Sequence, residues 1–144
     1  MKYALAVLVA TVVLAGCAKG AQSSAAASAS AAAANNPASA SDGGAVYIAN
    51  CSSCHQTNGQ GTPGAFPPLA GNPVVTGNPI ATILIVKNGL DGRVVVHGHA
   101  YSGIMPRWKG VLSDEQIASV ITYIRSSWKN NASGVSVSQV QAVK

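Results

Sequence analysis

Two cysteines and a histidine form the most informative motif of this chain, Cys51-Ser52-Ser53-Cys54-His55. Two thiols three residues apart near a helix end can each bond one vinyl group of a porphyrin, and the next residue can then bind the iron through its imidazole. The spacing Cys-x-x-Cys-His is the pattern of c-type haem attachment. It predicts one covalently attached haem c, held by Cys51 and Cys54, with His55 as an iron ligand.

Two other chemistries use a pair of cysteines at this spacing. A zinc site needs two further ligands, and the remaining candidates, His97 and His99, would complete an unusual ligand set. A thioredoxin-like dithiol lies in a βαβ unit, and the sequence shows no such pattern. Both readings stay open, but the sequence favours haem attachment over either of them.

Met105 is the candidate ligand for the opposite side of the iron. It is the only methionine besides Met1, and it lies in a Gly/Pro-containing loop that runs from Tyr101 to Pro106. A lone methionine usually fills a gap in a core. Pro106, however, biases its predecessor toward an extended backbone that can aim the thioether out of a loop. We therefore expect Met105 to bind the iron, with the two loop histidines as rivals.

The N-terminus has the features of a secretory signal. A positive start is followed by an apolar run from Tyr3 to Ala15, which falls short of the roughly 20 residues that span a bilayer. Leu14-Ala15-Gly16-Cys17 resembles the lipobox of bacterial lipoproteins, so residues 1–16 are expected to be a lipoprotein signal peptide and Cys17 to carry the lipid. The alternative is an uncleaved membrane anchor. With Cys17 lipidated and two cysteines on haem, no structural disulfide is left.

Three regions follow the expected signal peptide. Residues 17–41 are rich in Ala and Ser and lack large apolar side chains, so they predict a flexible tether with a span of roughly 25 to 30 Å. Residues 42–128 are expected to form one small domain whose marginal core is completed by an apolar cofactor. Residues 129–144 are expected to be a mobile tail.

The charge of the chain is modestly positive. It has nine Lys and Arg against four Asp and Glu, and removal of Lys2 with the signal leaves eight basic residues. These are scattered, whereas nucleic-acid binding normally needs a clustered basic stripe. The sequence therefore indicates no nucleic-acid partner, and it favours docking to an acidic redox protein.

Two helices are predicted before the methionine loop. The first begins near Ser41 and Asp42 and ends at Cys51. The second has Asn78 as its N-cap, Pro79 in its first turn and Gly89 as its stop signal. Its expected inward positions are Ile80, Ile83 and Leu84.

The final helix is the best defined. Ser113 and Gln116 form a capping box, and Leu112 can pack onto Ile117 in the first turn. One apolar face then continues along the helix through Val120, Ile121, Ile124 and Trp128. Between the helices lie long loops, in which residues 94–101 predict a short β hairpin.

Over residues 42–128 the chain resembles class I mono-haem cytochromes c. Gly43 and Tyr47 stand eight and four residues before the first haem cysteine, where this family has a glycine and an aromatic residue that meet the final helix at Val120 and Tyr123. The resemblance implies an all-α fold, a small cytochrome c fold with three main helices and long loops wrapped around one haem c.

Two further parts of the resemblance concern the haem pocket. The segment Phe66-Pro67-Pro68-Leu69 resembles the family loop in which a proline carbonyl accepts the proximal histidine's Nδ1 proton, a role that falls to Pro67, and in which Leu69 packs on haem. The region from Asn88 to Trp108 is similar to small cytochrome domains of bacterial membrane dehydrogenases and terminal oxidases. This likeness implies that Tyr101 and Trp108 line the methionine side of the haem pocket.

These expectations describe an electron carrier rather than an enzyme. With two axial ligands the iron would have no open position, so it would cycle between ferrous and ferric states. We expect a lipid-anchored protein on the periplasmic side of a bacterial membrane, which donates electrons to a terminal oxidase or reductase of a respiratory chain. The alternatives are a fixed cytochrome subunit of a membrane dehydrogenase or oxidase and, less favoured, a haem sensor or peroxidase-like enzyme.

Overall fold

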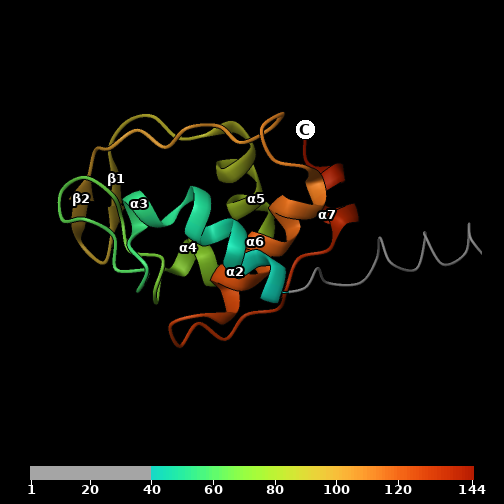
Figure 1. Cartoon of the computed structure of the whole chain (residues 1–144). Helices are drawn as coiled ribbons and strands as arrows, with labels where there is room; N and C mark the ends of the chain where they lie inside the picture. The colour runs from blue at the N-terminus through green and yellow to red at the C-terminus, as the bar shows by residue number, and fades with distance from the viewer. Residues whose placement is uncertain (1–39) are drawn as a thin grey trace, which may run out of the picture.

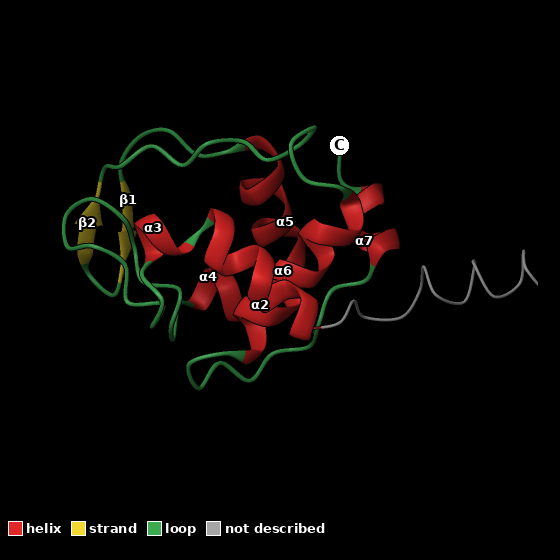
Figure 2. Cartoon of the chain, in the orientation of Figure 1, coloured by secondary structure: helices red, strands yellow, loops and turns green. Residues whose placement is uncertain are grey.

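The computed structural model describes residues 40–144 of the chain. The elements are, in order, α2 (Ala40–Asn50), α3 (Ser52–His55), α4 (Pro73–Thr76), α5 (Pro79–Asn88), β1 (Val94–Val96), β2 (His99–Tyr101), α6 (Asp114–Ser126) and α7 (Val137–Ala142). Figure 1 shows the two strands at the opposite end of the molecule from α7, and Figure 2 shows how much of the remaining chain is loop. The expected all-α fold with a small hairpin is confirmed.

The expectations for the N-terminal region concern residues that the structure does not describe. The signal peptide at residues 1–16, the lipidation of Cys17 and almost all of the tether at residues 17–41 lie outside the described residues. At the C-terminal end of the predicted tether the structure differs from the prediction, because α2 already begins at Ala40. Within residues 40–144, no helix is both long and apolar enough to cross a membrane.

The first and last long helices, α2 and α6, cross at very close range. A Cβ atom built on Gly43 would lie 2.0 Å from the carbonyl oxygen of Ser119, so only glycine allows this approach. Next to the crossing, the ring of Tyr47 lies 5.5 Å from that of Tyr123 and 5.0 Å from that of Trp128. The crossing therefore fixes α2, and with it the start of the cysteine motif, against the core.

The boundaries of α5 follow its capping residues. The side chain of Asn78 accepts a hydrogen bond from the backbone N–H of Ile80 at 3.0 Å, and Pro79 occupies the first turn. Gly89 ends the helix with φ 77°, a left-handed conformation that glycine adopts without a steric penalty. The predicted start and stop of this helix are both confirmed.

The inward face of α5 differs from the predicted one. Ile83 is fully buried as expected, but Ile80 and Leu84 are 51% and 41% exposed. The helix instead buries Thr82, Ile83, Val86 and Lys87. The physical reason is that the two polar side chains find acceptors outside the helix: the Thr82 hydroxyl donates to the nearby carbonyl of Val74, and Lys87 donates to carbonyls near the C-terminus.

The helix α6 forms the centre of the core. Its predicted capping box is present, with the backbone N–H of Gln116 donating to the Ser113 hydroxyl and the Gln116 side chain accepting from the Ser113 N–H. Its predicted face is buried at Ile117, Val120, Ile121 and Ile124. Trp128 lies beyond the end of the helix, where φ 51° turns the chain back toward the core.

The two strands form the expected hairpin. They pair antiparallel, with Val94 opposite Tyr101 and Val96 opposite His99. His97 and Gly98 connect them, and both have positive φ angles, as two-residue hairpin turns of the favoured type require.

The C-terminal segment is packed, so the expectation of a mobile tail at residues 129–144 is wrong. Val135 and Val140 are fully buried in the main core cluster. A second capping box, from Ser136 to Gln139, starts α7. The segment is also held through its backbone, because the Arg125 Nε donates to the carbonyl of Ser133 at 2.6 Å.

Candidate functional site

One large cavity lies between the cysteine motif, the hairpin and helices α5 and α6. It encloses about 1070 Å³ of empty space, including the part open to solvent. Apolar side chains form nearly all of its wall. Seven of the predicted site residues meet in it or in the adjoining hollow: Cys51, Cys54, His55, Pro67, Leu69, Met105 and Trp108.

The cysteine motif lies where α2 ends and α3 begins. The backbone N–H of Cys51 donates to the carbonyl of Tyr47, and the N–H of His55 donates to the carbonyl of Cys51. As free thiols, both cysteines are partly exposed toward the cavity side. Burial raises the pKa of the Cys51 thiol to about 11, with a smaller contribution from nearby Cys54. The Cys51 sulfur is therefore a neutral thiol at neutral pH.

Tyr47, four residues before the first cysteine of the motif, helps to hold the motif in place. Burial raises the pKa of Tyr47 above its usual range, so its hydroxyl stays protonated. That hydroxyl donates a hydrogen bond to the carbonyl of Gln56 at 2.5 Å, directly after His55. Both ends of the short motif helix are thereby tied to α2.

The imidazole of His55 is almost fully buried and oriented by a single acceptor. Its Nδ1 lies 3.0 Å from the carbonyl oxygen of Pro67, the hydrogen bond that the resemblance to class I cytochromes c implies. Burial lowers the pKa of His55, and the Pro67 hydrogen bond opposes this in part. The ring is therefore neutral with its proton on Nδ1, which leaves the Nε2 lone pair free for a metal.

The loop that bears Met105 is fixed by backbone pairing. The N–H of Met105 donates to the carbonyl of Leu90 at 2.9 Å, and the N–H of Leu90 donates back to the carbonyl of Met105 at 3.0 Å. A Cβ atom on Gly89 would lie 2.6 Å from the same Met105 carbonyl and 2.9 Å from the N–H nitrogen of Arg107. Position 89 must therefore be glycine for the loop to approach α5.

Replacement of Gly89 by alanine is expected to push the Met105 loop away from α5. The neighbouring atoms are backbone and cannot yield easily, so we expect a loss of about 2–4 kcal/mol from overpacking and left-handed strain together. The measurements are urea unfolding and the ligand-sensitive absorption of the oxidised holoprotein. Gly110→Ala is the matched control, because Gly110 has φ +86° but no neighbour within 4 Å of an added Cβ. Equal losses in both variants would contradict the role of the close approach.

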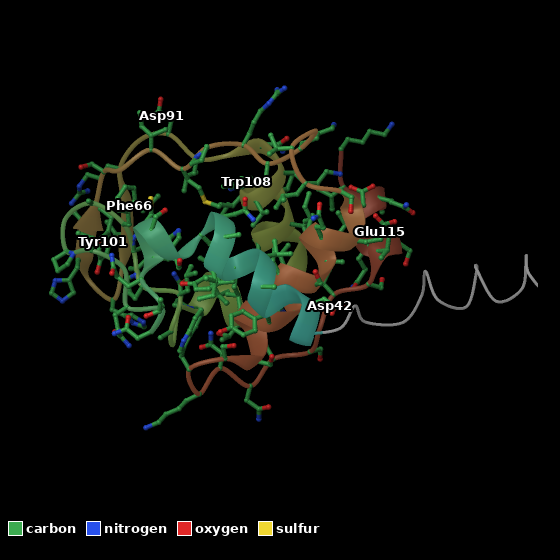
Figure 3. The ribbon with its side chains drawn as sticks, viewed as in Figure 1. Asp42, Phe66, Asp91, Tyr101, Trp108 and Glu115 are labelled. Atoms are coloured by element: carbon green, nitrogen blue, oxygen red, sulfur yellow. The ribbon has the colours of Figure 1, made fainter. Side chains whose placement is uncertain are left out.

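The predicted pocket residues that are neither cysteines nor iron ligands fall into two groups. Pro67, Leu69 and Trp108 line the main cavity. Tyr101 is buried in β2 opposite Val94 but does not line the cavity, so its expected role beside the cofactor stays a prediction. Figure 3 shows Tyr101 and Phe66 at the hairpin end of the molecule, with Trp108 nearer the helices.

The two rival histidines do not reach the cavity. The Nε2 of His97 lies 3.1 Å from the carbonyl oxygen of Gly71, and both His97 and His99 are exposed. Among residues 40–144 no group of three or more His, Cys, Asp or Glu side chains could hold a metal ion. This part of the chain offers no zinc site of the kind that was left open above.

Sequence reasoning missed several lining residues. Phe66 faces both the cavity and the adjoining hollow, and its ring centroid lies 6.4 Å from that of His55. Asn72 lines the wall while its side chain caps α4 and donates to the carbonyl of Pro68 at 2.8 Å. Phe66 directly precedes Pro67 and Pro68, so its position in that loop could have indicated that it lines the cavity. For Asn72, the sequence Asn72-Pro73 was an available capping signal.

These residues fit a covalently held porphyrin. The wall is apolar and broad, as a largely apolar macrocycle requires. Two thiols lie at its edge, an imidazole with a free Nε2 lies on one side, and a thioether comes from a separate loop. Among residues 40–144, Cys51 and Cys54 are the only cysteines and Met105 is the only methionine, so no other part of the described chain offers this donor set.

Comparison with known proteins agrees with this geometry. Residues 40–128 match the family described as cytochrome c. The chain belongs to the cytochrome c family. As a cytochrome c, it is an electron-transfer protein with covalently bound haem c and is not itself a catalytic enzyme. The zinc and dithiol readings of the motif are therefore wrong.

Three relatives illustrate how this family is used. Over 91 residues the chain is 44% identical to cytochrome c-552 of Thermus thermophilus, which covers 60% of this chain and 68% of that protein. Over 105 residues it is 42% identical to the cytochrome c subunit of the quinone-dependent alcohol dehydrogenase of Gluconobacter oxydans, with 71% of this chain and 22% of that subunit covered. Over 94 residues it is 32% identical to the cbb3-type cytochrome c oxidase subunit CcoP of Azospirillum brasilense, with 62% of this chain and 28% of that subunit covered.

Proposed function

We propose that this cytochrome c carries single electrons with His55 and Met105 as the two axial ligands and with Cys51 and Cys54 as the attachment points. The observation that carries the proposal is the His55–Pro67 hydrogen bond at 3.0 Å, which leaves Nε2 free in a cavity that Met105 also lines. Haem c, when bound, supplies the one-electron couple between ferrous and ferric iron.

The residues around the site favour transfer over reaction chemistry. The Pro67 carbonyl fixes the ring and the tautomer of His55, and the Leu90 pairing fixes the backbone of Met105. The apolar wall limits the entry of water, which together with a thioether ligand favours the ferrous state and raises the potential. With both axial positions filled, no coordination site is left for a substrate.

Carbon monoxide distinguishes this carrier from a haem sensor or peroxidase-like protein. The reduced native holoprotein is expected to show no spectral change when carbon monoxide is added without denaturant. Its voltammogram is expected to contain one reversible one-electron wave. Immediate carbon monoxide binding by the native protein would instead indicate an open or labile axial position.

The partners are proposed from the relatives and the charge pattern. A membrane dehydrogenase as electron donor and a terminal oxidase or reductase as acceptor would fit a bacterial respiratory chain, since relatives include subunits of such complexes. The chain covers between 21% and 28% of those subunits. The almost uncharged Ala/Ser-rich composition of residues 17–41 supports a mobile shuttle over a fixed subunit. Purification of the native protein in mild detergent tests this choice. A stable stoichiometric complex would support the fixed subunit.

A lipid on Cys17 is proposed to hold the protein on the periplasmic side of the membrane. The support is the Leu14-Ala15-Gly16-Cys17 sequence behind an apolar run. Replacing Cys17 with serine is expected to move nearly all of the protein from the membrane fraction to the soluble periplasmic fraction, because a lipid chain adds about 0.8 kcal/mol of membrane affinity per buried methylene. Haem content and absorption are expected to stay unchanged. Retention of the variant in the membrane would support the uncleaved anchor.

A further inference from the structure

The segment after Trp128 contains a buried polar side chain that the proposed function does not use. The family match ends at residue 128, yet Asn130 is only 5% exposed. The two residues before it, Trp128 and Lys129, have φ angles of 51° and 69°. Such left-handed conformations cost non-glycine residues about 1 kcal/mol or more each, so surrounding contacts must hold this turn.

Asn130 makes three hydrogen bonds that join two distant parts of the chain. Its Nδ2 donates to the carbonyl of Ile124 at 2.8 Å and to the carbonyl of Leu69 at 3.0 Å. Its Oδ1 accepts from the backbone N–H of Gly71 at 2.8 Å. The Ile124 carbonyl belongs to the last turn of α6, where helix carbonyls lack partners within the helix. Asn130 therefore ties the end of α6 to residues 69–71.

Residues 69–71 belong to the loop that orients the proximal histidine. Leu69 lines the cavity, and Pro67, two residues earlier, accepts the Nδ1 proton of His55. Other ties to this loop are the N–H groups of Leu69 and Ala70, which both donate to the carbonyl of Gly59, and the side chain of Asn72, which donates to the carbonyl of Pro68. At Gly71 the exposed His97 ring also contacts the carbonyl oxygen. Asn130 differs from these contacts because it is buried and joins both Leu69 and Gly71 to the end of α6.

We infer that Asn130 is a positioning residue for the axial histidine, an inference that rests on the ligand role proposed for His55. By fixing residues 69–71, it keeps the Pro67 carbonyl in hydrogen-bonding position. A firm hydrogen bond to Nδ1 makes the imidazole a better electron donor and favours ferric iron. The C-terminal segment thus sets the reduction potential as well as the stability of the fold.

Replacing Asn130 with alanine in the full-length holoprotein tests the inference by two readouts. Exchange of the His55 Nδ1 proton with solvent, followed by NMR, is expected to become about three- to tenfold faster. This factor corresponds to the free energy of one hydrogen bond lost from the protected state. The reduction potential is expected to shift to a more positive value. If the alanine variant does not fold, Asn130→Ser keeps a short polar group there and is measured in the same way.

Ser136→Ala is the matched control. It removes the capping box of α7 in the same C-terminal segment without touching residues 67–71. It is expected to lower stability while leaving both the proton exchange and the potential at wild-type values. If the Asn130 variant changes neither readout, or if Ser136→Ala changes both to the same extent, Asn130 has no positioning role. A wild-type spectrum without iron-shifted His55 signals would instead refute the ligand role of His55 itself.

Discussion

Alanine at position 105 is expected to leave the iron with a weak or exchangeable sixth ligand. As the proposed iron ligand, the thioether of Met105 would stabilise ferrous iron, so its loss should lower the reduction potential by on the order of 100 mV, within the ~0.8 V range that axial ligands span. The reduced variant should bind carbon monoxide at once. Voltammetry and difference spectra measure the two effects. The loop itself should persist, because backbone hydrogen bonds between Met105 and Leu90 hold it.

Two variants separate ligand loss from loop damage. Ile104→Ala changes the exposed neighbour, which is 66% exposed, and should leave the potential near the wild-type value. Met105→His should keep a six-coordinate iron that rejects carbon monoxide, at a lower potential than the native protein. An unaltered spectrum and potential in Met105→Ala would show that another group binds the iron.

Alanine at Gly43 should disrupt the crossing of α2 and α6 more severely than a typical core substitution. The added Cβ would lie 2.0 Å from the Ser119 carbonyl oxygen and 2.5 Å from its carbon, and neither backbone atom can move without shifting α6. We expect a loss of about 3 kcal/mol or more in the free energy of unfolding, at the upper end for overpacking. Urea unfolding and the yield of haem-loaded protein measure the effect.

Gly44→Ala is the control for this prediction. Its added Cβ would lie 3.3 Å from Cε2 of Tyr123, the edge of a side chain that can shift slightly. Alanine also favours a helix over glycine by about 1 kcal/mol, so this variant should remain within about 1 kcal/mol of the native protein. A Gly43 variant as stable as the Gly44 variant would show that the helices can separate at little cost.

Local signals explain which parts of the fold could be predicted. The ends of α5 and α6 follow from Asn78, Gly89 and the capping box at Ser113, because each acts within one turn of the helix. The glycine at position 43 was recognisable by its distance from the first haem cysteine. The cofactor could be predicted from the cysteine motif alone, since haem attachment requires residues that are close together in the sequence.

Long-range partners explain what could not be predicted. Periodicity favoured Ile80 and Leu84 as core residues. Lys87 is buried instead, because two carbonyls near the C-terminus accept hydrogen bonds from its ammonium group. No local pattern encodes such a partner more than fifty positions away. The packed C-terminal segment had one local signal, the Ser136–Gln139 capping box, which has the same form as the box at Ser113.

The burial of Lys87 gives the C-terminal region a built-in chemical reporter. Its ammonium group is enclosed, with the side chain 4% exposed, and it donates to the carbonyls of Val140 and Val143. Amine-reactive reagents should therefore modify the surface lysines rapidly and Lys87 only when α7 detaches. The slow phase of Lys87 labelling, followed by mass spectrometry, would give the opening rate of this part of the molecule without any substitution in the chain.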